Sequence, residues 1–458
     1  MVLLKRGNQL HDQTEVAAFR SPSIRKVALA SLIGTSVEWY DFFLYGTASA
    51  LIFARLFFPT FDPLTGTLAA FGTFAVGFAA RPIGGIVCGH FGDRIGRRSM
   101  LVVSLLIMGI ATFLIGLLPT YHQVGIWAPI LLVLLRIAQG FGLGGQWGGA
   151  VLMAVEHSPK GKRGFYGSWP QIGLPVGLLL STLVFGLISR LPEAALLAWG
   201  WRMAFLISIV LVGLGLYIRL SIAEPPVFAE VKQTHTTSRT PILEALRRHP
   251  KNIALVMGAR IAENGAFYLF SVFVLTYATL PSIGFSRATA LTAVSIAALI
   301  QIFTIPAFGL LSDRLGRRPI YLFGAIFTGV FAFPFFWLIE TSIPGLLVLS
   351  MVLALSVGHA AMYAPQASFF AELFGTRVRY SGLSLGYQLA SVIAGGLSPI
   401  IATSLLRQSG SSSPIALYII IMAAITTVSV YLAAETTHHD IAAPAADSAV
   451  ESVRLGQP

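Results

Sequence analysis

The feature that most constrains the fold of this chain is a series of twelve apolar segments. A helix needs about 20 apolar residues to cross a bilayer. The segments span approximately residues 27–56, 65–89, 99–118, 126–153, 165–189, 199–221, 252–279, 287–311, 319–339, 343–371, 380–405 and 414–434. They are too long and too continuously apolar for the alternating strands of a membrane β-barrel. The sequence therefore predicts an all-α membrane protein with twelve transmembrane helices.

Composition excludes the soluble alternatives. Charged residues make up only 11% of the chain, whereas a soluble domain carries about 25%. This scarcity of charge, together with 32 phenylalanines, excludes a disordered chain, a coiled coil and an ordinary soluble enzyme. The single cysteine, Cys88, excludes an intramolecular disulfide and a metal site built from several cysteines.

The longest polar gap divides the twelve segments into six and six. We predict an N-terminal tail at 1–26, a first six-helix bundle at 27–221, a central loop at 222–251, a second bundle at 252–434 and a disordered tail at 435–458. The first 26 residues contain no short apolar core followed by a small-residue cleavage site, so we expect a tail rather than a cleaved signal.

The positions of Lys and Arg predict the orientation. If both termini are cytoplasmic, 23 of the 31 basic residues fall in cytoplasmic segments and 3 in outer loops. Cytoplasmic loops of membrane proteins carry such an excess. The net charge of +12 thus needs no nucleic-acid partner, and we expect a multi-pass protein of the inner or plasma membrane.

A ten-residue motif occurs twice, with an offset of 220 residues. It supplies Gly89, Asp93, Arg94, Gly96, Arg97 and Arg98 after the second segment, and Gly309, Asp313, Arg314, Gly316, Arg317 and Arg318 after the eighth. The repetition indicates two homologous six-helix halves. We expect tight turns at Gly96 and Gly316, and an Asp that binds a neighbouring helix N-terminus or the arginines. The alternative is that the motif only fixes topology.

The double motif on twelve segments resembles the major facilitator superfamily. Strings at 34–43, 80–85, 136–141 and 156–164 are similar to its metabolite:proton symporter branch, which transports shikimate, α-ketoglutarate, citrate or proline and betaine. The resemblance covers about residues 25–435. The chain departs from the branch at Gln146, where a Glu is usual, and lacks the coiled-coil tail typical of the osmolyte transporters.

Charged residues inside an apolar segment cost at least about 2.5 kcal/mol each, so they need a reason. Glu38 and Asp41 lie three residues apart on one face of the first helix. Repulsion and burial favour proton binding by such carboxylates, and we predict that they couple transport to protons. A structural ion pair with a nearby helix is the alternative.

Two arginines are the predicted anion ligands. Arg81 in the second segment and Arg136 in the fourth each present a guanidinium that binds a carboxylate bidentately, and the resemblance supports this role. We add Gln139 and Gln146 as polar contacts. The alternative for both arginines is a buried ion pair. The glycine-rich run at 140–149 lies in an apolar helix, so we interpret it as a packing surface and not as a phosphate-binding loop.

The second half is polar but less charged, which predicts polar substrate contacts there. The residues that we select are Arg260, Glu263, Asn264, Tyr268, Gln301, His359, Tyr363 and Gln366. Gln301 and Gln366 occupy the repeat positions of Arg81 and Gln146. An internal Arg260–Glu263 ion pair and a satisfied structural histidine are the alternatives.

Four further charged residues lie at the predicted cytoplasmic helix ends: Glu156, Arg163, Glu372 and Arg377. Together with the two motifs we predict that they form salt bridges that break on opening, which makes them a cytoplasmic gate.

The sequence thus predicts a secondary active transporter that imports a small organic acid by proton symport and alternating access. The alternatives are a zwitterionic osmolyte symporter, an uncoupled facilitator and an efflux carrier. There is no nucleophile elbow, zinc spacing or nucleotide loop in the sequence, so we expect no enzyme activity, no cofactor and no metal. The expected partners are the organic anion, the proton and the lipid bilayer, and we expect a monomer.

Overall fold

The computed structural model describes residues 24–95, 97–144, 146–156, 158–221, 246–374 and 379–437, and every regular element in these ranges is a helix. Ten helices or unbroken helix runs in this part of the chain are long and apolar enough to cross a membrane, and Val102–Leu117 is a shorter apolar stretch. The first helix, which carries Glu38 and Asp41, completes the predicted twelve.

The first half consists of α2 (Ile24–Leu51), α3 (Phe53–Phe57), α4 (Pro63–Ile95), α5 (Arg97–Leu117), α6 (Tyr121–Val124), α7 (Trp127–Leu143), α8 (Trp147–Glu156), α9 (Arg163–Ile188), α10 (Glu193–Ala195), η1 (Leu196–Gly200), α11 (Trp201–Leu206) and α12 (Ser208–Ser221). Helices α7 and α8 together form one predicted span, and the series from α10 to α12 forms another. We call residues 24–221 the N-half.

The second half consists of α15 (Pro250–Tyr268), η2 (Leu269–Phe273), α16 (Val274–Ala278), α17 (Arg287–Leu315), α18 (Arg317–Glu340), α19 (Pro344–Met351), η3 (Val352–His359), α20 (Ala360–Glu372), α21 (Arg379–Ala390), η4 (Ser391–Gly396), α22 (Ser398–Ser409) and α23 (Ser413–Leu432). We call residues 246–437 the C-half.

Local sequence explains where several of these helices begin and end. Pro250 and Pro344 stand in the first turn of their helices, where a missing N–H leaves no bond unmade. Ser286 caps α17, because its Oγ accepts from the N–H of Thr289 at 3.1 Å. Gly316 separates α17 from α18 with φ 105°, a conformation that favours glycine. The predicted tight turn at Gly316 is therefore confirmed.

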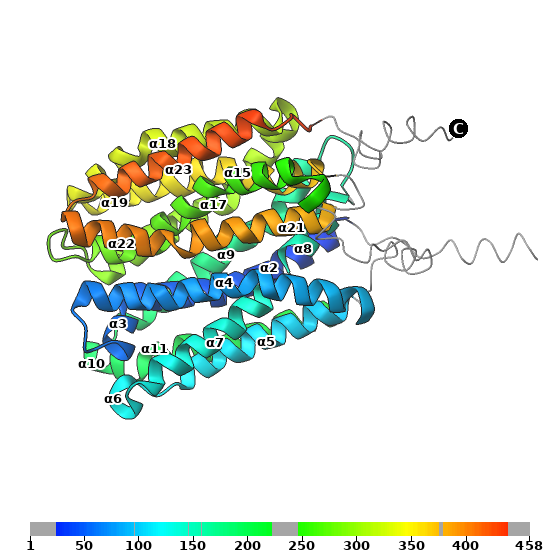
Figure 1. Ribbon diagram of the computed structural model, residues 1–458. Coiled ribbons are helices and arrows are strands. Elements are labelled where there is room, and N and C mark those ends of the chain that lie inside the picture. Colours follow the sequence, from blue (N-terminus) through cyan, green and yellow to red (C-terminus); the bar gives the residue numbers. More distant parts are fainter. Residues whose placement is uncertain are drawn as a thin grey trace, which may run out of the picture.

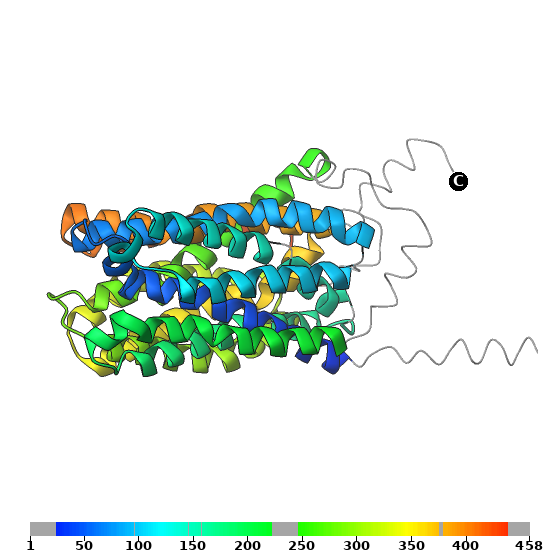
Figure 2. The ribbon, with the colours of Figure 1, turned by 90° about the horizontal axis from the view of Figure 1, so that it is seen from below.

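The two halves lie side by side, with their long helices running in roughly the same direction (Figure 1). In Figure 1 the blue and cyan helices α3 to α7 of the N-half lie below the green to red helices of the C-half, so the two halves overlap in the view from below (Figure 2). They contact each other where α9 packs on α17 and α20, and where α4 packs on α21, η4 and α22. We call the end at which α17 meets α18 the motif end, and the end with α3, α6 and α10 the opposite end.

Several predicted boundaries can be compared with the described residues. The helix α2 begins at Ile24, slightly before the predicted start at residue 27. Glu435, Thr436 and Thr437, which we predicted in the disordered tail, instead contact the C-half. Residues 1–23, 222–245 and 438–458 lie outside the described residues.

Candidate functional site

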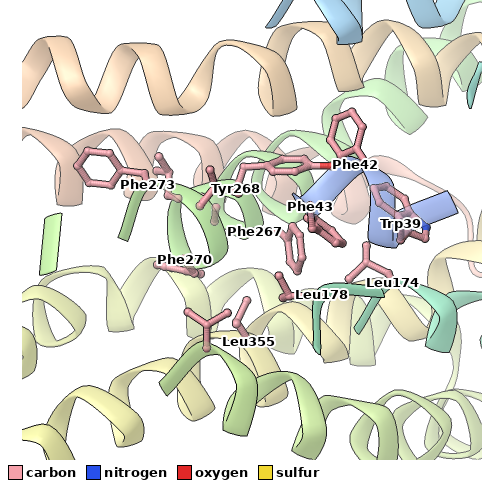
Figure 3. Packing of buried hydrophobic residues seen from close by; sticks show 14 of the residues in the cluster. Trp39, Phe42, Phe43, Leu174, Leu178, Phe267, Tyr268, Phe270, Phe273 and Leu355 are labelled. Atoms are coloured by element: carbon pink, nitrogen blue, oxygen red, sulfur yellow. The ribbon is translucent and has the colours of Figure 1, made fainter. Parts of the chain in front are cut away.

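A cluster of buried aromatic side chains fills the place where α2 meets α15 (Figure 3). Phe43 lies 5.6 Å from Phe267, and Phe42 lies 6.1 Å from Tyr268, measured between ring centroids. Trp39 stacks on Phe43 at 5.3 Å. The two halves therefore meet at aromatic rings, and the charged residues that we predicted from the sequence surround these rings.

Arg81 and Arg136 share one aromatic ring. The guanidinium carbon of each lies 4.2 Å from the centroid of Phe42. Phe78 lies against Arg81 at 4.2 Å, and Tyr45 against Arg136 at 4.3 Å. Such contacts contribute about 2 kcal/mol when the cation is desolvated, less than the several kcal/mol that burial of a cation costs.

Burial leaves both arginines with unused hydrogen-bond donors. Arg81 is 2% exposed and Arg136 is 0% exposed. The Nε and Nη2 atoms of both side chains have no hydrogen-bond partner among the described residues. Buried donors normally find partners, so these four nitrogen atoms mark a place suited to an anionic group.

Close contact between α4 and α7 brings the arginines to this ring. A Cβ atom on Gly140 would overlap the backbone of Gly77, and one on Gly144 would overlap the carbonyl oxygen of Arg81. The interpretation of the glycine-rich run as a packing surface is confirmed for these two positions. Gly77 has a second role, because a Cβ atom there would overlap the guanidinium of Arg136.

Gln139 is bound to Arg136 and to the neighbouring helix α5. Arg136 Nη1 donates to Gln139 Oε1 at 2.7 Å, and Gln139 Nε2 donates to Thr112 Oγ1 at 2.6 Å. These bonds hold the guanidinium in one orientation. The sequence indicated Gln139 but not Thr112, because a threonine in an apolar helix commonly bonds only its own backbone.

The two carboxylates of α2 have different surroundings. Asp41 is fully buried, and neither of its oxygens has a hydrogen-bond partner in the described part of the chain. Glu38 faces Gln146. With its amide nitrogen turned toward Glu38, Gln146 donates to both carboxylate oxygens, at 2.6 Å to Oε2, and its Oε1 accepts from the N–H of Leu105 at 3.3 Å. The amide of Gln146 therefore donates to the carboxylate of Glu38 at the position where the resemblance predicts a glutamate.

In the C-half, Arg260 is paired. Its Nη1 donates to Glu263 Oε2 at 2.7 Å and to Gln366 Oε1 at 3.0 Å, and its Nε donates to Ser391 Oγ at 3.1 Å. Gln366 Nε2 also donates to Glu263 Oε2, at 2.8 Å. The Arg260–Glu263 ion pair, which we gave as an alternative, is present, and Arg260 thus differs from Arg81 and Arg136.

His359 connects this ion pair to Gln301. His359 Nε2 lies 3.1 Å from Glu263 Oε1, and His359 Nδ1 lies 2.6 Å from Gln301 Nε2. Gln301 Nε2 also donates to the carbonyl oxygen of Leu355 at 2.9 Å. Five of the selected residues, from α15, α17 and the η3–α20 run, therefore form one network.

The remaining predicted contacts lie between this network and the N-half. Asn264 Oδ1 and the hydroxyls of Tyr268 and Tyr363 are buried and have no partner among the described residues. A Cβ atom on Gly395 would meet Asn264, Tyr268 and Phe78, so polar groups of the C-half and an aromatic ring beside Arg81 surround one point.

Helix α21 contributes residues that the sequence did not indicate. The ring of Tyr387 lies 3.3 Å from the guanidinium carbon of Arg260 and stacks on Trp147 of the N-half at 3.5 Å between centroids. Gln388 Nε2 donates to the carbonyl oxygen of Gly144 at 2.8 Å. Aromatic and amide side chains are scattered along this helix without a regular spacing, so the sequence gives no indication of their role. Their contacts become apparent only from the packing of α21 against the N-half.

At the motif end, Asp313 of the C-half caps a helix of the N-half. It accepts from the N–H groups of Gly164 and Phe165 at the start of α9, both at 2.8 Å. Arg317 Nη1 donates to Asp313 Oδ1 at 2.8 Å, and Arg317 Nε donates to Glu372 Oε2 at 3.4 Å. The second copy of the motif thus joins the two halves.

Further ion pairs cross the interface beside this cap. Arg163 lies 4.0 Å from Glu372, and Arg379, which we did not predict, lies 3.3 Å from Glu156. Arg318 instead donates to backbone oxygens of α23, and Arg314 is exposed. Seven predicted gate residues have side chains or positions outside the described part: Gly89, Asp93, Arg94, Gly96, Arg97, Arg98 and Arg377.

Ion pairs also join the halves at the opposite end. Glu193 of α10 binds Arg55 of α3 and, at 3.3 Å, Arg287 of α17. Asp62 lies 3.6 Å from Arg407 of α22. The buried polar site therefore lies between two sets of contacts, one at each end of the molecule. Two six-helix bundles around a shielded polar site are the arrangement of a membrane transporter.

Comparison with known sequences identifies the family of transporters to which the chain is similar. The Major Facilitator Superfamily profile matches residues 32–399 and 265–455. The shikimate transporter of Escherichia coli (strain K12) is 44% identical over 400 residues, with 86% of this chain and 91% of that protein covered. The proline/betaine transporter of the same organism is 34% identical, with 96% and 90% covered.

Solved structures share the fold at low identity. A proton:xylose symporter, XylE, bound to 6-bromo-6-deoxy-D-glucose superimposes with a TM-score of 0.72 at 17% identity, with 90% of this chain and 96% of that chain covered. The chain belongs to the major facilitator superfamily. Members of this family are transporters and not enzymes, so the protein is a multi-pass membrane transporter.

Proposed function

We propose that the protein imports a small organic acid anion, such as shikimate or a related mono- or dicarboxylate, together with a proton. The observation that carries this proposal is the pair of buried guanidiniums at Phe42. Arg81 and Arg136 have no ion-pair partner among the described side chains, and each has two unused donors. A carboxylate accepts two parallel N–H bonds from such a fork.

The identity of the relatives agrees with an acidic cargo. A protein that is 44% identical is a shikimate transporter, and a further relative in Escherichia coli (strain K12), 40% identical, is an inner membrane metabolite transport protein. The partnerless oxygens of Asn264, Tyr268 and Tyr363 suit hydroxyl groups on the rest of the molecule. We therefore assign the carboxylate to the N-half and the polar body of the substrate to the C-half.

We assign the coupling proton to Asp41. An ionised carboxylate that is buried without a donor costs several kcal/mol, and binding a proton removes this cost. Glu38 has a donor in Gln146, which suits a carboxylate that stays ionised. Gln146 thus leaves the chain with one proton carrier in α2 and does not by itself remove coupling.

Transport requires the two ends to open in turn. We assign the motif end to the cytoplasm of an inner-membrane protein, as the distribution of basic residues predicts, with both termini inside. The Asp313 cap and the pairs of Glu372 and Glu156 then form the cytoplasmic gate, and the pairs of Glu193 and Asp62 the outer one. Rocking of the bundles breaks one set at a time.

An osmolyte symporter is the second candidate, because a proline/betaine transporter is 34% identical over 96% of this chain. A quaternary ammonium group binds best on open aromatic faces. Here Phe42, Phe78 and Tyr45 are already in contact with guanidiniums, which would repel such a cation. We therefore favour the acid.

The test is uptake into proteoliposomes with an imposed inward proton gradient. The panel contains shikimate, α-ketoglutarate, citrate, benzoate, proline and betaine. We expect one acid to accumulate, a protonophore to abolish the accumulation, and Arg81→Ala to reduce uptake by at least about tenfold, because a charge-assisted bond contributes about 1.5–3 kcal/mol. The matched control is Arg190→Ala, which removes an exposed arginine and should transport normally.

The other outcomes are informative. Accumulation of betaine or proline instead of an acid would overturn the assignment of the arginines as ligands. Equilibration of an acid without dependence on the gradient would contradict coupling through Asp41 and indicate a facilitator. Normal uptake by Arg81→Ala would remove Arg81 from the site.

A further inference from the structure

His359 is held in one tautomer by its neighbours. The carbonyl oxygen of Leu355 only accepts, so it fixes the amide of Gln301 with Nε2 toward the backbone and toward His359 Nδ1. An amide nitrogen only donates, and His359 Nδ1 must therefore accept. The hydrogen of the neutral ring is then on Nε2, where Glu263 Oε1 accepts it at 3.1 Å.

Gln301 also carries a hydrogen-bond acceptor for a second proton on the His359 ring. Its Oε1 is buried and has no hydrogen-bond partner in the described part of the chain. A proton added at His359 Nδ1 would face the amide nitrogen of Gln301, which is another donor. Rotation of that amide would replace the nitrogen with Oε1, an acceptor, and would break the bond to Leu355. Proton binding by His359 is thus linked to a movement of Gln301.

Glu263 is shared between the histidine and the arginine. Its Oε2 accepts from Arg260 Nη1 and Gln366 Nε2, whereas its Oε1 faces His359. The other groups around this network are tyrosines: Tyr268 on α15, Tyr321 on α18, Tyr363 on α20 and Tyr387 on α21. They are neutral at physiological pH. Among the described residues, the formal charges within the network are therefore those of Arg260 and Glu263, which cancel, and the guanidinium of Arg81 acts on Arg260 from the N-half.

The cancellation constrains what can bind. A proton added to the network alone leaves one extra positive charge in a region shielded from water, beside the guanidinium of Arg81. This state is costly in a medium of low dielectric constant, and an anion bound next to Arg260 removes the cost. Adding an anion and a proton together keeps the network neutral, so the binding of each favours the binding of the other.

We propose that His359 is a second proton-binding residue, distinct from the carboxylates of α2, and that its protonation releases Arg260 to bind the substrate anion. The proton adds to Nδ1, Glu263 stays ionised, and the imidazolium takes over its neutralisation. The guanidinium then exchanges Glu263 for the carboxylate of the substrate, which it shares with Arg81. This inference rests on the proposed function and adds a second coupling site in the C-half.

The backbone around the network is suited to such a rearrangement. The π-helical segment η3 ends at His359, and η4 begins at Ser391, which binds Arg260. Segments of this type are frequent at functional sites. Each places one member of the network where helical hydrogen bonding changes register, so the side chains are not held by a regular helix on both sides.

The test measures equilibrium binding of radiolabelled shikimate to the purified full chain at about pH 8 and about pH 5.5, on either side of the ordinary histidine range. All variants carry Asp41→Asn, so that the N-half carboxylate does not contribute. With His359 intact we expect affinity to rise about tenfold at the lower pH. With His359→Gln it should change less than about twofold. The matched control is His122→Gln, which replaces an exposed histidine on α6 and should keep the rise.

A second variant is expected to act in the reverse direction. Glu263→Gln removes the anion that holds Arg260, so affinity at about pH 8 should already match the low-pH value of the parent. A histidine ¹⁵N spectrum of the unsubstituted chain, with the His359 signal assigned by its loss in His359→Gln, should show an Nε2–H tautomer at high pH and an imidazolium when shikimate is bound at low pH.

The outcomes separate this inference from the proposed function. If the unsubstituted chain binds shikimate and His359→Gln keeps the full rise in affinity, the inference is wrong and acid transport stands. An imidazole that stays neutral with shikimate bound at low pH is equally contrary to it. If the unsubstituted chain binds none of the acids of the uptake panel, the proposed function fails, and this inference fails with it.

Discussion

At the scale of single residues, Gly77 is what allows Arg136 to lie beside Phe42. A Cβ atom on Gly77 would overlap the guanidinium, and an added methyl in a packed interior costs about 1–3 kcal/mol. We expect Gly77→Ala to displace Arg136 and to reduce uptake of the transported acid about tenfold or more. The control is Gly72→Ala on the same helix, where a Cβ atom meets nothing within 4 Å. Normal uptake by both variants would show that the position of Arg136 is not critical.

A second prediction at this scale concerns Asp41. Asparagine has nearly the same shape but cannot carry a proton, so Asp41→Asn should abolish accumulation driven by a proton gradient while exchange of labelled for unlabelled acid continues. Counterflow and gradient-driven uptake, measured on the same proteoliposomes, separate the two. Glu340→Gln, at an exposed carboxyl at the end of α18, is the matched control. Retained accumulation in Asp41→Asn would transfer the role of the carrier to another residue.

Sequence alone revealed the charged half of this site and missed the rest for physical reasons. Arg81, Arg136 and Asp41 were visible because a charge in an apolar segment is costly and hence conspicuous. Phe42 and Gly77 were not, because aromatic residues and glycines are common wherever transmembrane helices pack. Their roles depend on which helix lies opposite, and this is a property of the folded chain.

At the scale of elements, the start of α18 is capped by residues that follow α23. Glu435 accepts from the N–H groups of Arg317 at 2.9 Å and Arg318 at 3.0 Å. Thr436 donates to Glu372 at 2.6 Å. A carboxylate at a helix N-terminus satisfies free N–H groups and complements the helix dipole. Residues after α23 therefore brace the helix that follows the second motif.

Removing this brace should lower stability. Loss of an N-terminal cap costs about 1 kcal/mol, and we expect the midpoint of thermal unfolding in detergent to fall by about 2 °C when the chain ends at Ala434 instead of Thr437. The matched pair differs only in the three capping residues, so an equal midpoint in the two truncated chains would contradict the assignment.

The same cap predicts a pH dependence. Burial raises the pKa of the Glu435 carboxyl, but hydrogen bonds from Thr437 and from the N–H groups of Arg317 and Arg318 lower it more, so its pKa lies below the ordinary value. A lowered pKa means that the ionised form contributes stability above about pH 4.3, which is lost as pH falls through the folded-state value. Glu435→Gln should therefore be less stable than the unsubstituted chain at pH 7, and the difference should shrink in acid. A difference that is independent of pH would point to shape and not charge.

Sequence predicted the transmembrane elements well and their interruptions not at all. Hydropathy identifies long apolar runs, so the twelve spans agree with the structure to within a few residues at most ends. The π-helical segments η2, η3 and η4 have the same apolar composition as the helices around them. What distinguishes them is a change in hydrogen-bond partner, which depends on tertiary packing and leaves no pattern in composition.

At the scale of the whole molecule, the repeat extends beyond the motif to the site. Gln146 faces Glu38 in the N-half, and Gln366 donates to Glu263 in the C-half. In each half, a glutamine of the fourth span thus donates a hydrogen bond to a glutamate of the first span. The repeat positions of the glutamines were visible in the sequence. The pairing was not, because Glu38 and Glu263 do not share the offset of the motif.

The two ends of the molecule differ in how strongly they are held. At the motif end, Asp313 is nearly buried and binds two N–H groups and Arg317, and removing one partner of a buried pair costs about 3–5 kcal/mol. At the opposite end the pairs of Glu193 and Asp62 are exposed, and such pairs contribute about 0–1 kcal/mol each. We therefore expect Asp313→Asn to open the motif end, and Glu193→Gln combined with Asp62→Asn to open the opposite end by a smaller shift in population.

Both population shifts can be measured from the distance between two spin labels placed across each end. The labels are attached to introduced cysteines in a chain that carries Cys88→Ser. Labels at Lys160→Cys and Leu315→Cys report on the motif end, and labels at Arg190→Cys and Ile343→Cys report on the other. Hydrogen bonds from Thr65 and the charge of Arg407 hold the pKa of Asp62 below its usual value, so the contribution of the Asp62–Arg407 pair in the unsubstituted chain should be lost only when the pH falls below the ordinary carboxyl range. Because a rocking transporter opens one end as it closes the other, the two variants should change the two distances in opposite senses. Lengthening of both distances in one variant would mean that the bundles separate and do not rock.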